Sequence, residues 1–94
     1  MNHYVYIVCC ADGSLYTGYA TDVEKRVREH NGEVNAKAAA RYTRGRRPIS
    51  LVYTELCASR SDALKRECAI KTLTRSEKLL LINLFDDNIS HKVS

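Results

Sequence analysis

Glu67 is an ionisable residue at a position where the surrounding pattern predicts a hydrophobic core. Residues 62–73 (DALKRECAIKTL) have the spacing of an amphipathic helix, and Glu67 falls within its apolar face. That face comprises Ala63, Leu64, Cys68, Ile70 and Leu73. An unpaired buried carboxylate is costly, so Glu67 requires a cationic partner, a metal ion or a solvent-filled cleft. A structural ion pair and a metal site both satisfy this requirement.

Tyr6 and Tyr16 lie on the same face of a predicted β-hairpin in one of two turn geometries. With Gly13 in the left-handed position of a three-residue loop, Tyr6 pairs with Gly18. The two tyrosines are then diagonal neighbours, about 7–8 Å apart at the backbone, and Gly18 leaves open space beside the Tyr6 ring. A two-residue turn at Asp12 would shift the register and put the tyrosines on opposite faces. Phenols on one face can position water or phosphate, although ordinary amphipathic strands have the same pattern.

Arg26 and His30 lie four residues apart on one side of a predicted helix. Thr21 and Glu24 form a capping-box pattern that opens this helix, and Gly32 supplies its expected stop signal. An arginine and a histidine at this spacing can both reach one phosphate group. A single histidine on an apolar helical stripe is also commonly a structural residue of the core. Both interpretations of His30 are open.

A cluster of basic residues occupies residues 41–47 (RYTRGRR), within a predicted loop over residues 32–48. The chain has a formal net charge of +4 and a pI near 9.0, which favours an anionic partner. The candidate nucleic-acid contacts are Lys37, Arg41, Tyr42, Thr43, Arg44, Arg46 and Arg47. The cationic side chains would bind phosphates, and Tyr42 would stack on a base or contact the backbone. A solvated surface is the alternative interpretation of this cluster.

These residues are carried by elements predicted in the order β-β-α-loop-β-α-α. Residues 4–10 and 14–20 are rich in aromatic and β-branched residues and are predicted strands, as are residues 50–57. Ser61 begins the predicted helix that holds Glu67.

A last helix is predicted from a second capping box, formed by Thr74 and Glu77, to about Phe85. Its LLLINLF run is apolar nearly all round, so we expect this helix to be substantially buried. The polar residues 86–94 are expected to form a frayed tail, which leaves residues 1–85 as the folded domain.

Length and composition are those of one small globular domain of 94 residues. The sequence contains no apolar run of the roughly 18 residues that a membrane span requires, and it begins without a signal-peptide pattern. Its four cysteines lack metal-ligand spacing, so we expect reduced thiols in a cytoplasmic protein.

Three motifs together resemble the GIY-YIG nuclease domain. They are residues 5–7 (VYI), residues 15–18 (LYTG) and residues 23–26 (VEKR), followed by His30 and by a glutamate on a later helix. The resemblance covers about residues 4–84, and it is strongest to small stand-alone bacterial members and to the catalytic domain of Slx-type endonucleases. The first motif lacks its glycine, and Tyr19 stands where some relatives have lysine.

The resemblance implies an α+β fold, with a three-stranded antiparallel sheet flanked by three helices. It also implies roles for five residues. Arg26 matches the arginine that contacts the scissile phosphate, and Glu67 matches the single carboxylate that binds Mg²⁺, or Mn²⁺ in its place. Tyr6 matches the tyrosine that serves as general base, with His30 as the alternative base, and Tyr16 would position water or phosphate.

The implied activity is metal-dependent hydrolysis of phosphodiester bonds in nucleic acid, with DNA as the expected substrate. A domain this small has little surface for base-specific contacts, so we expect recognition of structure rather than of sequence, with a protein partner as one source of target choice. Two rival hypotheses are a nucleic-acid-binding module of the same fold with little catalytic activity and a protein-interaction module.

Overall fold

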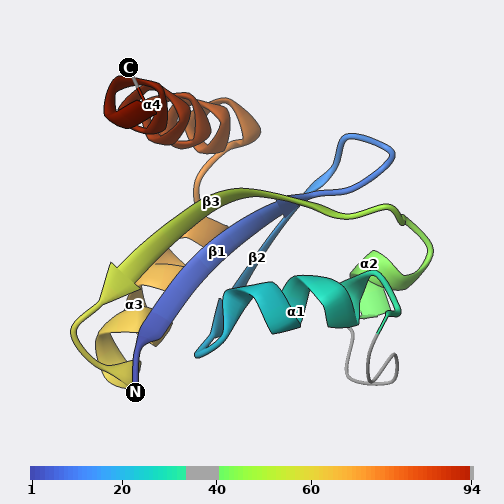
Figure 1. The fold of residues 1–94 in the computed structure, drawn as a ribbon, viewed down its shortest axis with the longest axis horizontal. Coiled ribbons are helices and arrows are strands. Elements are labelled where there is room, and N and C mark those ends of the chain that lie inside the picture. The colour runs from blue at the N-terminus through green and yellow to red at the C-terminus, as the bar shows by residue number, and fades with distance from the viewer. Residues whose placement is uncertain (34–40, 94) are drawn as a thin grey trace.

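The computed structural model describes residues 1–33 and 41–93, so the predicted contact Lys37 lies outside the described residues. The elements are β1 (His3–Cys9), β2 (Leu15–Ala20), α1 (Val23–His30), α2 (Arg41–Arg44), β3 (Ser50–Cys57), α3 (Arg60–Lys71) and α4 (Arg75–Val93). The strands form one antiparallel sheet in the order β2-β1-β3 (Figure 1). The predicted α+β class and element order are confirmed, with the short helix α2 added before β3.

The β1–β2 hairpin has the three-residue loop that keeps the two tyrosines on one face. Gly13 has φ +84°, in the left-handed region, and the Cys10 amide donates to the Ser14 carbonyl at 2.8 Å. Tyr6 pairs with Gly18 in this register. Of the two turn geometries left open by the sequence, the protein has the three-residue loop.

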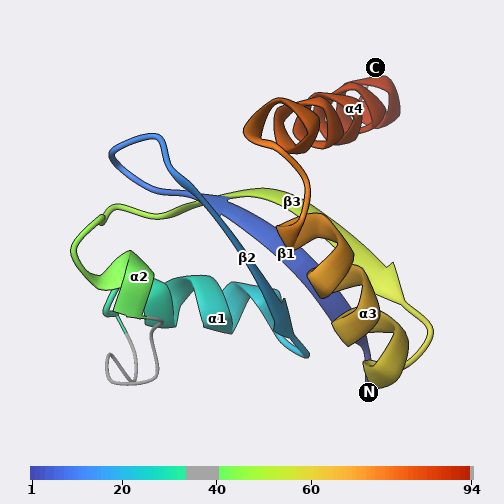
Figure 2. The same cartoon turned by 180° about the vertical axis from the view of Figure 1, so that it is seen from behind.

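The sheet has an apolar core on each face, as strand alternation requires. Val5 and Ile7 of β1 face α3 and α4, where they pack with Ala63, Ile70 and Ile82. Alternate residues of β1 point the other way, toward α1, into a second cluster. That cluster comprises Tyr6, Val8, Cys10, Ala20 and Ile49, with Tyr16, Val23 and Val27 packed against it. Helices α1 and α3 thus lie on opposite sides of the central strand (Figures 1 and 2).

Two of the predicted helix starts need correction. Asp22, rather than Thr21, caps α1, because its Oδ1 accepts from the Lys25 amide at 3.0 Å. The helix therefore begins at Val23, one residue later than a Thr21 cap would give. Ser59 caps α3, which begins at Arg60 rather than at the predicted Ser61. Each shift is small because several polar residues that can cap a helix stand side by side at these points.

The capping box before α4 is confirmed. The Thr74 amide donates to Glu77 Oε1 at 2.9 Å, and the Glu77 amide donates to Thr74 Oγ1 at 3.2 Å. The helix continues to Val93, past the end predicted near Phe85, in a stretch without glycine or proline.

The prediction that α4 is substantially buried is wrong. Ile82 is buried and the Phe85 ring packs edge-on against Tyr53 at 5.5 Å, whereas Leu80 and Leu84 are 60% and 55% exposed. The sheet lies on one side of α4 only, so an all-round apolar sequence has no second surface to cover it (Figure 1). Within the described residues, no helix has the length and apolarity needed to cross a membrane.

Candidate active site

The Tyr6 phenol and the His30 imidazole meet beneath α1. The Tyr6 hydroxyl lies 2.8 Å from His30 Nε2, and both side chains are almost fully buried, with exposures of 1% and 0%. Tyr6 is brought there by strand alternation, and His30 by the apolar stripe of α1 that also carries Val23 and Val27. The sequence pattern therefore placed this histidine correctly on the core-facing side of its helix.

Tyr16 completes an aromatic cluster around His30. Its ring centroid lies 5.4 Å from the His30 ring in an edge-on arrangement, and the Tyr6 ring centroid lies 5.9 Å from it. Gly18 leaves space for the Tyr6 ring, because a Cβ atom at residue 18 would come within 2.6 Å of Tyr6 Cζ. In the LYTG motif, Gly18 therefore makes room for Tyr6, and Tyr16 packs against His30.

Arg26 connects this cluster to the surface. Its guanidinium hydrogen bonds to the Tyr6 phenol and also donates from Nη1 to Glu29 Oε1 at 3.3 Å. Glu29 is buried, and it was not among the site residues predicted from the sequence. The available signal was its spacing of three residues from Arg26 on one helix, which brings a carboxylate beside the guanidinium.

Both members of the Tyr6–His30 pair are neutral at neutral pH. Burial raises the pKa of Tyr6 to about 12, although the hydrogen bond from Arg26 opposes this shift. Burial, aided by the positive charge of Arg26, lowers the pKa of His30 to about 4. In the resting protein the phenol therefore keeps its proton and the imidazole has one nitrogen free to accept a hydrogen bond.

Thr43 also belongs to this cluster, which corrects its predicted role. Its Oγ1 lies 2.8 Å from His30 Nδ1, and its side chain has 0% exposure. The Thr43 hydroxyl faces His30 rather than the surface, so the structure does not support its predicted role as a nucleic-acid contact. Helix α2 belongs to the basic segment (residues 41–47) and lies beside the end of α1 (Figure 1). This position turns one residue of the basic segment inward.

Glu67 comes from α3, on the other side of the central strand. It lies between the fully buried Ala63 and Ile70 on one helical face, as the spacing predicted, and its side chain is 17% exposed. Lys71 Nζ lies 3.2 Å from Glu67 Oε2. The carboxylate is also near enough to Tyr6 to act, as the smallest of several causes, against ionisation of the phenol.

The GIY-YIG catalytic domain is the family model that matches the chain, over residues 2–80. The chain belongs to the GIY-YIG family. Two curated relatives have similar lengths. A UPF0213 protein of Staphylococcus saprophyticus, SSP2268, is 57% identical over 81 residues, which cover 86% of this chain and 94% of the relative. The UPF0213 protein SA0446 of Staphylococcus aureus is 58% identical over the same shares of the two chains.

Two proteins with solution NMR structures have a similar fold. The UPF0213 protein BH0048 of Bacillus halodurans is 48% identical and aligns with a TM-score of 0.56, covering 89% of this chain and 85% of that one. The protein EF2693 of E. faecalis is 40% identical with a TM-score of 0.59, covering 92% and 88%. The structure brings Tyr6, Tyr16, Arg26 and His30 together, and these residues with Glu67 of α3 are the candidate active-site residues.

The GIY-YIG family implies a divalent metal ion, and the residues present fit one type of ion. Within the described residues there is no group of three or more His, Cys, Asp or Glu side chains that could enclose a metal. Zinc sites need such a group, whereas Mg²⁺ keeps several waters and binds through one or two carboxylates. Glu67, a single partly buried carboxylate, fits the second type.

Polar contacts made by the basic segment and by the residues next to it connect this part of the chain to α1 and to the hairpin loop. Arg47 Nε donates to the His30 carbonyl at 2.7 Å, and Arg46 Nε pairs with Asp12 Oδ2 at 3.1 Å. Asn31 exchanges two hydrogen bonds with the Ile49 backbone, at 2.7 and 2.9 Å. These contacts fix the segment against the end of α1 and against the hairpin loop.

Phosphate contact by the basic segment stays a prediction at most of its positions. Arg44 and Arg47 are exposed, and Arg46 is half-buried. The side chains of Arg41 and Tyr42 lie outside the described part of the chain.

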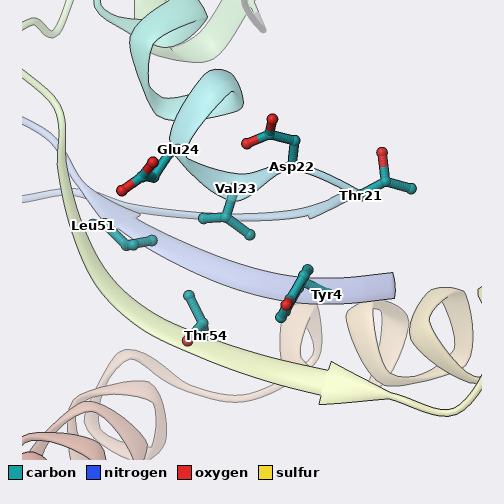
Figure 3. A pocket seen from close by; sticks show the side chains of 7 residues that line it. All are labelled: Tyr4, Thr21, Asp22, Val23, Glu24, Leu51 and Thr54. Carbon is teal, nitrogen blue, oxygen red and sulfur yellow. The ribbon is translucent and has the colours of Figure 1, made fainter. Parts of the chain in front are cut away.

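Two open hollows flank the first half of α1, and they differ in their relation to the site. One, of about 350 Å³, contains Arg26, Glu29 and Lys25 and opens beside β2. The other, of about 330 Å³, lies between the start of α1, with Val23 and Glu24, and the sheet, with Tyr4, Leu51 and Thr54 (Figure 3). It contains none of the five candidate catalytic residues. Of these two hollows, the one beside β2 contains a candidate catalytic residue, Arg26.

Proposed function

We propose that this protein is a metal-dependent nuclease that hydrolyses phosphodiester bonds in DNA and recognises the structure of its substrate rather than its sequence. The observation that supports this function best is the shared hydrogen bonding of one phenol. The Tyr6 hydroxyl lies 2.8 Å from His30 Nε2 and also receives a hydrogen bond from Arg26, which is partly exposed. In this function, a proton acceptor and a phosphate-binding side chain would both contact the Tyr6 phenol.

Arg26 would bind the non-bridging oxygens of the scissile phosphate. A guanidinium binds phosphate oxygens through paired N–H donors, and it neutralises the charge that builds as the pentavalent state forms. Glu29, 3.3 Å from Arg26 Nη1, holds the guanidinium in a fixed orientation while leaving it open to the hollow beside β2.

Tyr6 and His30 would together remove the proton of the attacking water. The water would transfer one proton to the Tyr6 oxygen while the Tyr6 proton passes to His30 Nε2, so that hydroxide attacks phosphorus. The bond to the 3′-oxygen would break as this attack proceeds, and the leaving oxygen would take up a proton from solvent. Because the pKa of Tyr6 is raised to about 12, a free phenolate is a poor starting state, and this concerted transfer avoids it. Tyr16, beside His30, would orient the water.

Glu67 would hold Mg²⁺, which when bound supplies charge stabilisation for the leaving oxygen. Lys71, 3.2 Å from Glu67, would have to share or release the carboxylate when the ion binds. That ion pair is also the observation that favours a second candidate function. A nucleic-acid-binding module of the same fold would keep Glu67 neutralised by Lys71 and would not need the metal.

A cleavage assay on a panel of substrates separates the two functions. Labelled duplex, flap, branched and single-stranded DNA and RNA are incubated with the protein in Mg²⁺, Mn²⁺ or EDTA, with Glu67→Gln alongside. Asp62→Asn, an exposed acidic residue on the same helix, is the matched control. The nuclease function predicts metal-dependent cutting that Glu67→Gln loses and Asp62→Asn keeps. Binding without cutting by the wild-type protein would favour the binding module.

A further inference from the structure

The hydroxyl of Thr43 is placed as a partner for His30 rather than for a ligand. Thr43 lies in α2, among arginines, yet it has no exposed surface, and its Oγ1 lies 2.8 Å from His30 Nδ1. His30 thus has a partner at each ring nitrogen, with Tyr6 at Nε2 and Thr43 at Nδ1. Both partners are hydroxyl groups, which can donate or accept.

The direction of both hydrogen bonds follows from the burial of the Tyr6 hydroxyl. The phenol keeps its proton, and a buried proton of this kind needs an acceptor. His30 Nε2 is the acceptor at hydrogen-bond distance. A neutral imidazole carries one proton, so an unprotonated Nε2 places that proton on Nδ1, from which it is donated to Thr43 Oγ1.

We propose that Thr43 is a positioning residue that accepts the Nδ1 proton of His30 and, together with Tyr6, stabilises the tautomer in which Nε2 is free to receive the Tyr6 proton. This role rests on the proposed nuclease function, because the tautomer matters to catalysis only if His30 accepts that proton. In the other tautomer, Nε2 would carry a hydrogen and the path from Tyr6 would be blocked.

The backbone around Thr43 is suited to holding its hydroxyl in place. The Arg46 amide donates to the Thr43 carbonyl at 3.0 Å, and the Arg46 carbonyl accepts from the Ala11 amide at 2.8 Å. Arg47 Nε binds the carbonyl of His30 itself at 2.7 Å. The segment that carries Thr43 is therefore bound both to the hairpin loop and to the residue whose ring it orients, which limits relative movement of the two side chains.

Nitrogen NMR of the histidine rings tests the tautomer without any need for activity. The full chain is labelled with ¹⁵N-histidine, and His30 is assigned among the three histidines from the spectrum of His30→Gln. We expect a protonated Nδ1 and an unprotonated Nε2 in the wild-type protein and in Thr43→Ser. Thr43→Val, which removes the acceptor but keeps the shape, should shift His30 toward the Nε2–H form. A wild-type spectrum with Nε2–H, or an Nδ1–H form unchanged in Thr43→Val, would overturn the proposal.

Tyr6→Phe separates the influence of Thr43 from that of Tyr6. If Thr43 contributes to the tautomer, Tyr6→Phe keeps part of the Nδ1–H form, and complete conversion to Nε2–H would overturn the proposal. In cleavage assays, Thr43→Val should reduce kcat about tenfold while Thr43→Ser restores it. An unchanged kcat in Thr43→Val would also count against the role. Absence of cleavage by the wild-type protein would refute the nuclease function instead, and the spectra would still report on the tautomer.

Discussion

The hydroxyl of Tyr6 and Nε2 of His30 lie 2.8 Å apart at a point where neither side chain has more than 1% exposure. One residue comes from the central strand and the other from the end of α1, 24 positions later in the chain. A buried donor or acceptor is costly when it has no partner. This hydrogen bond therefore stabilises the fold in addition to any role in catalysis.

Gly18→Ala should destabilise the protein because the new methyl group has no room beside Tyr6. Its Cβ would lie 2.6 Å from Tyr6 Cζ and 2.9 Å from Cε1, so the ring has to move within a packed core. We expect a loss of about 1–3 kcal/mol in the free energy of unfolding, measured with urea. Gly45→Ala is the matched control, since no atom lies within 4 Å of a Cβ there. Equal stabilities for the two variants would show that the Tyr6 ring is not confined.

The exposure of α4 gives a second stability prediction. Ile82→Ala removes a buried side chain and should cost about 2–4 kcal/mol, because it leaves a cavity between α4 and the sheet. Leu80→Ala, on the exposed side of the same helix, should change stability by less than about 0.5 kcal/mol. A large loss in Leu80→Ala would mean that this side of α4 is covered in solution, which concentration-dependent unfolding would reveal.

The depressed pKa of His30 predicts a loss of stability in mild acid. Burial comes first among its causes, followed by the charge of Arg26, with Arg47 acting in the same direction and Glu29 against them. His30 titrates near 6.5 when unfolded and near 4 when folded, so the unfolded state binds the extra proton between these values. The free energy of unfolding should therefore fall as pH decreases from about 6.5 to 4, by up to about 3 kcal/mol.

His30→Gln is the comparison for this pH dependence, because it removes the titrating group and leaves the carboxylates unchanged. We expect its stability to decline less steeply than that of the wild-type protein over the same pH range. Parallel curves for the two proteins would contradict the lowered pKa.

The hairpin and the active-site side of α1 were predictable because local rules determine them. A glycine in the left-handed position fixes the loop, and the loop fixes the pairing of Tyr6 with Gly18. The 3.6-residue repeat places His30 inward. Thr43 and the exposed side of α4 were not predictable in this way, since each depends on how elements far apart in sequence pack. A threonine among arginines carries no local sign of being buried.

Replacing Arg44 and Arg46 together with alanine tests the remaining part of the basic segment. If both side chains contact phosphates, binding should weaken similarly on all DNA sequences, and the slope of log K against log salt should fall by about two. Fluorescence anisotropy over a salt series measures both effects. Arg60→Ala, an exposed arginine at the start of α3, is the control and should leave the slope unchanged. An unaltered slope in the double variant would mean that the segment is only a solvated surface.

The most direct test of the central claim is the single-turnover cleavage rate of Tyr6→Phe compared with Tyr4→Phe. Both changes remove one hydroxyl from β1, but Tyr4 contacts only an exposed Asn2 among the hydrogen bonds described, whereas Tyr6 joins His30 to Arg26. The proposed mechanism predicts a loss of about 10²- to 10⁴-fold in Tyr6→Phe, with DNA affinity retained, and a nearly unchanged rate in Tyr4→Phe. Equal rates in the two variants would contradict a catalytic role for the buried phenol.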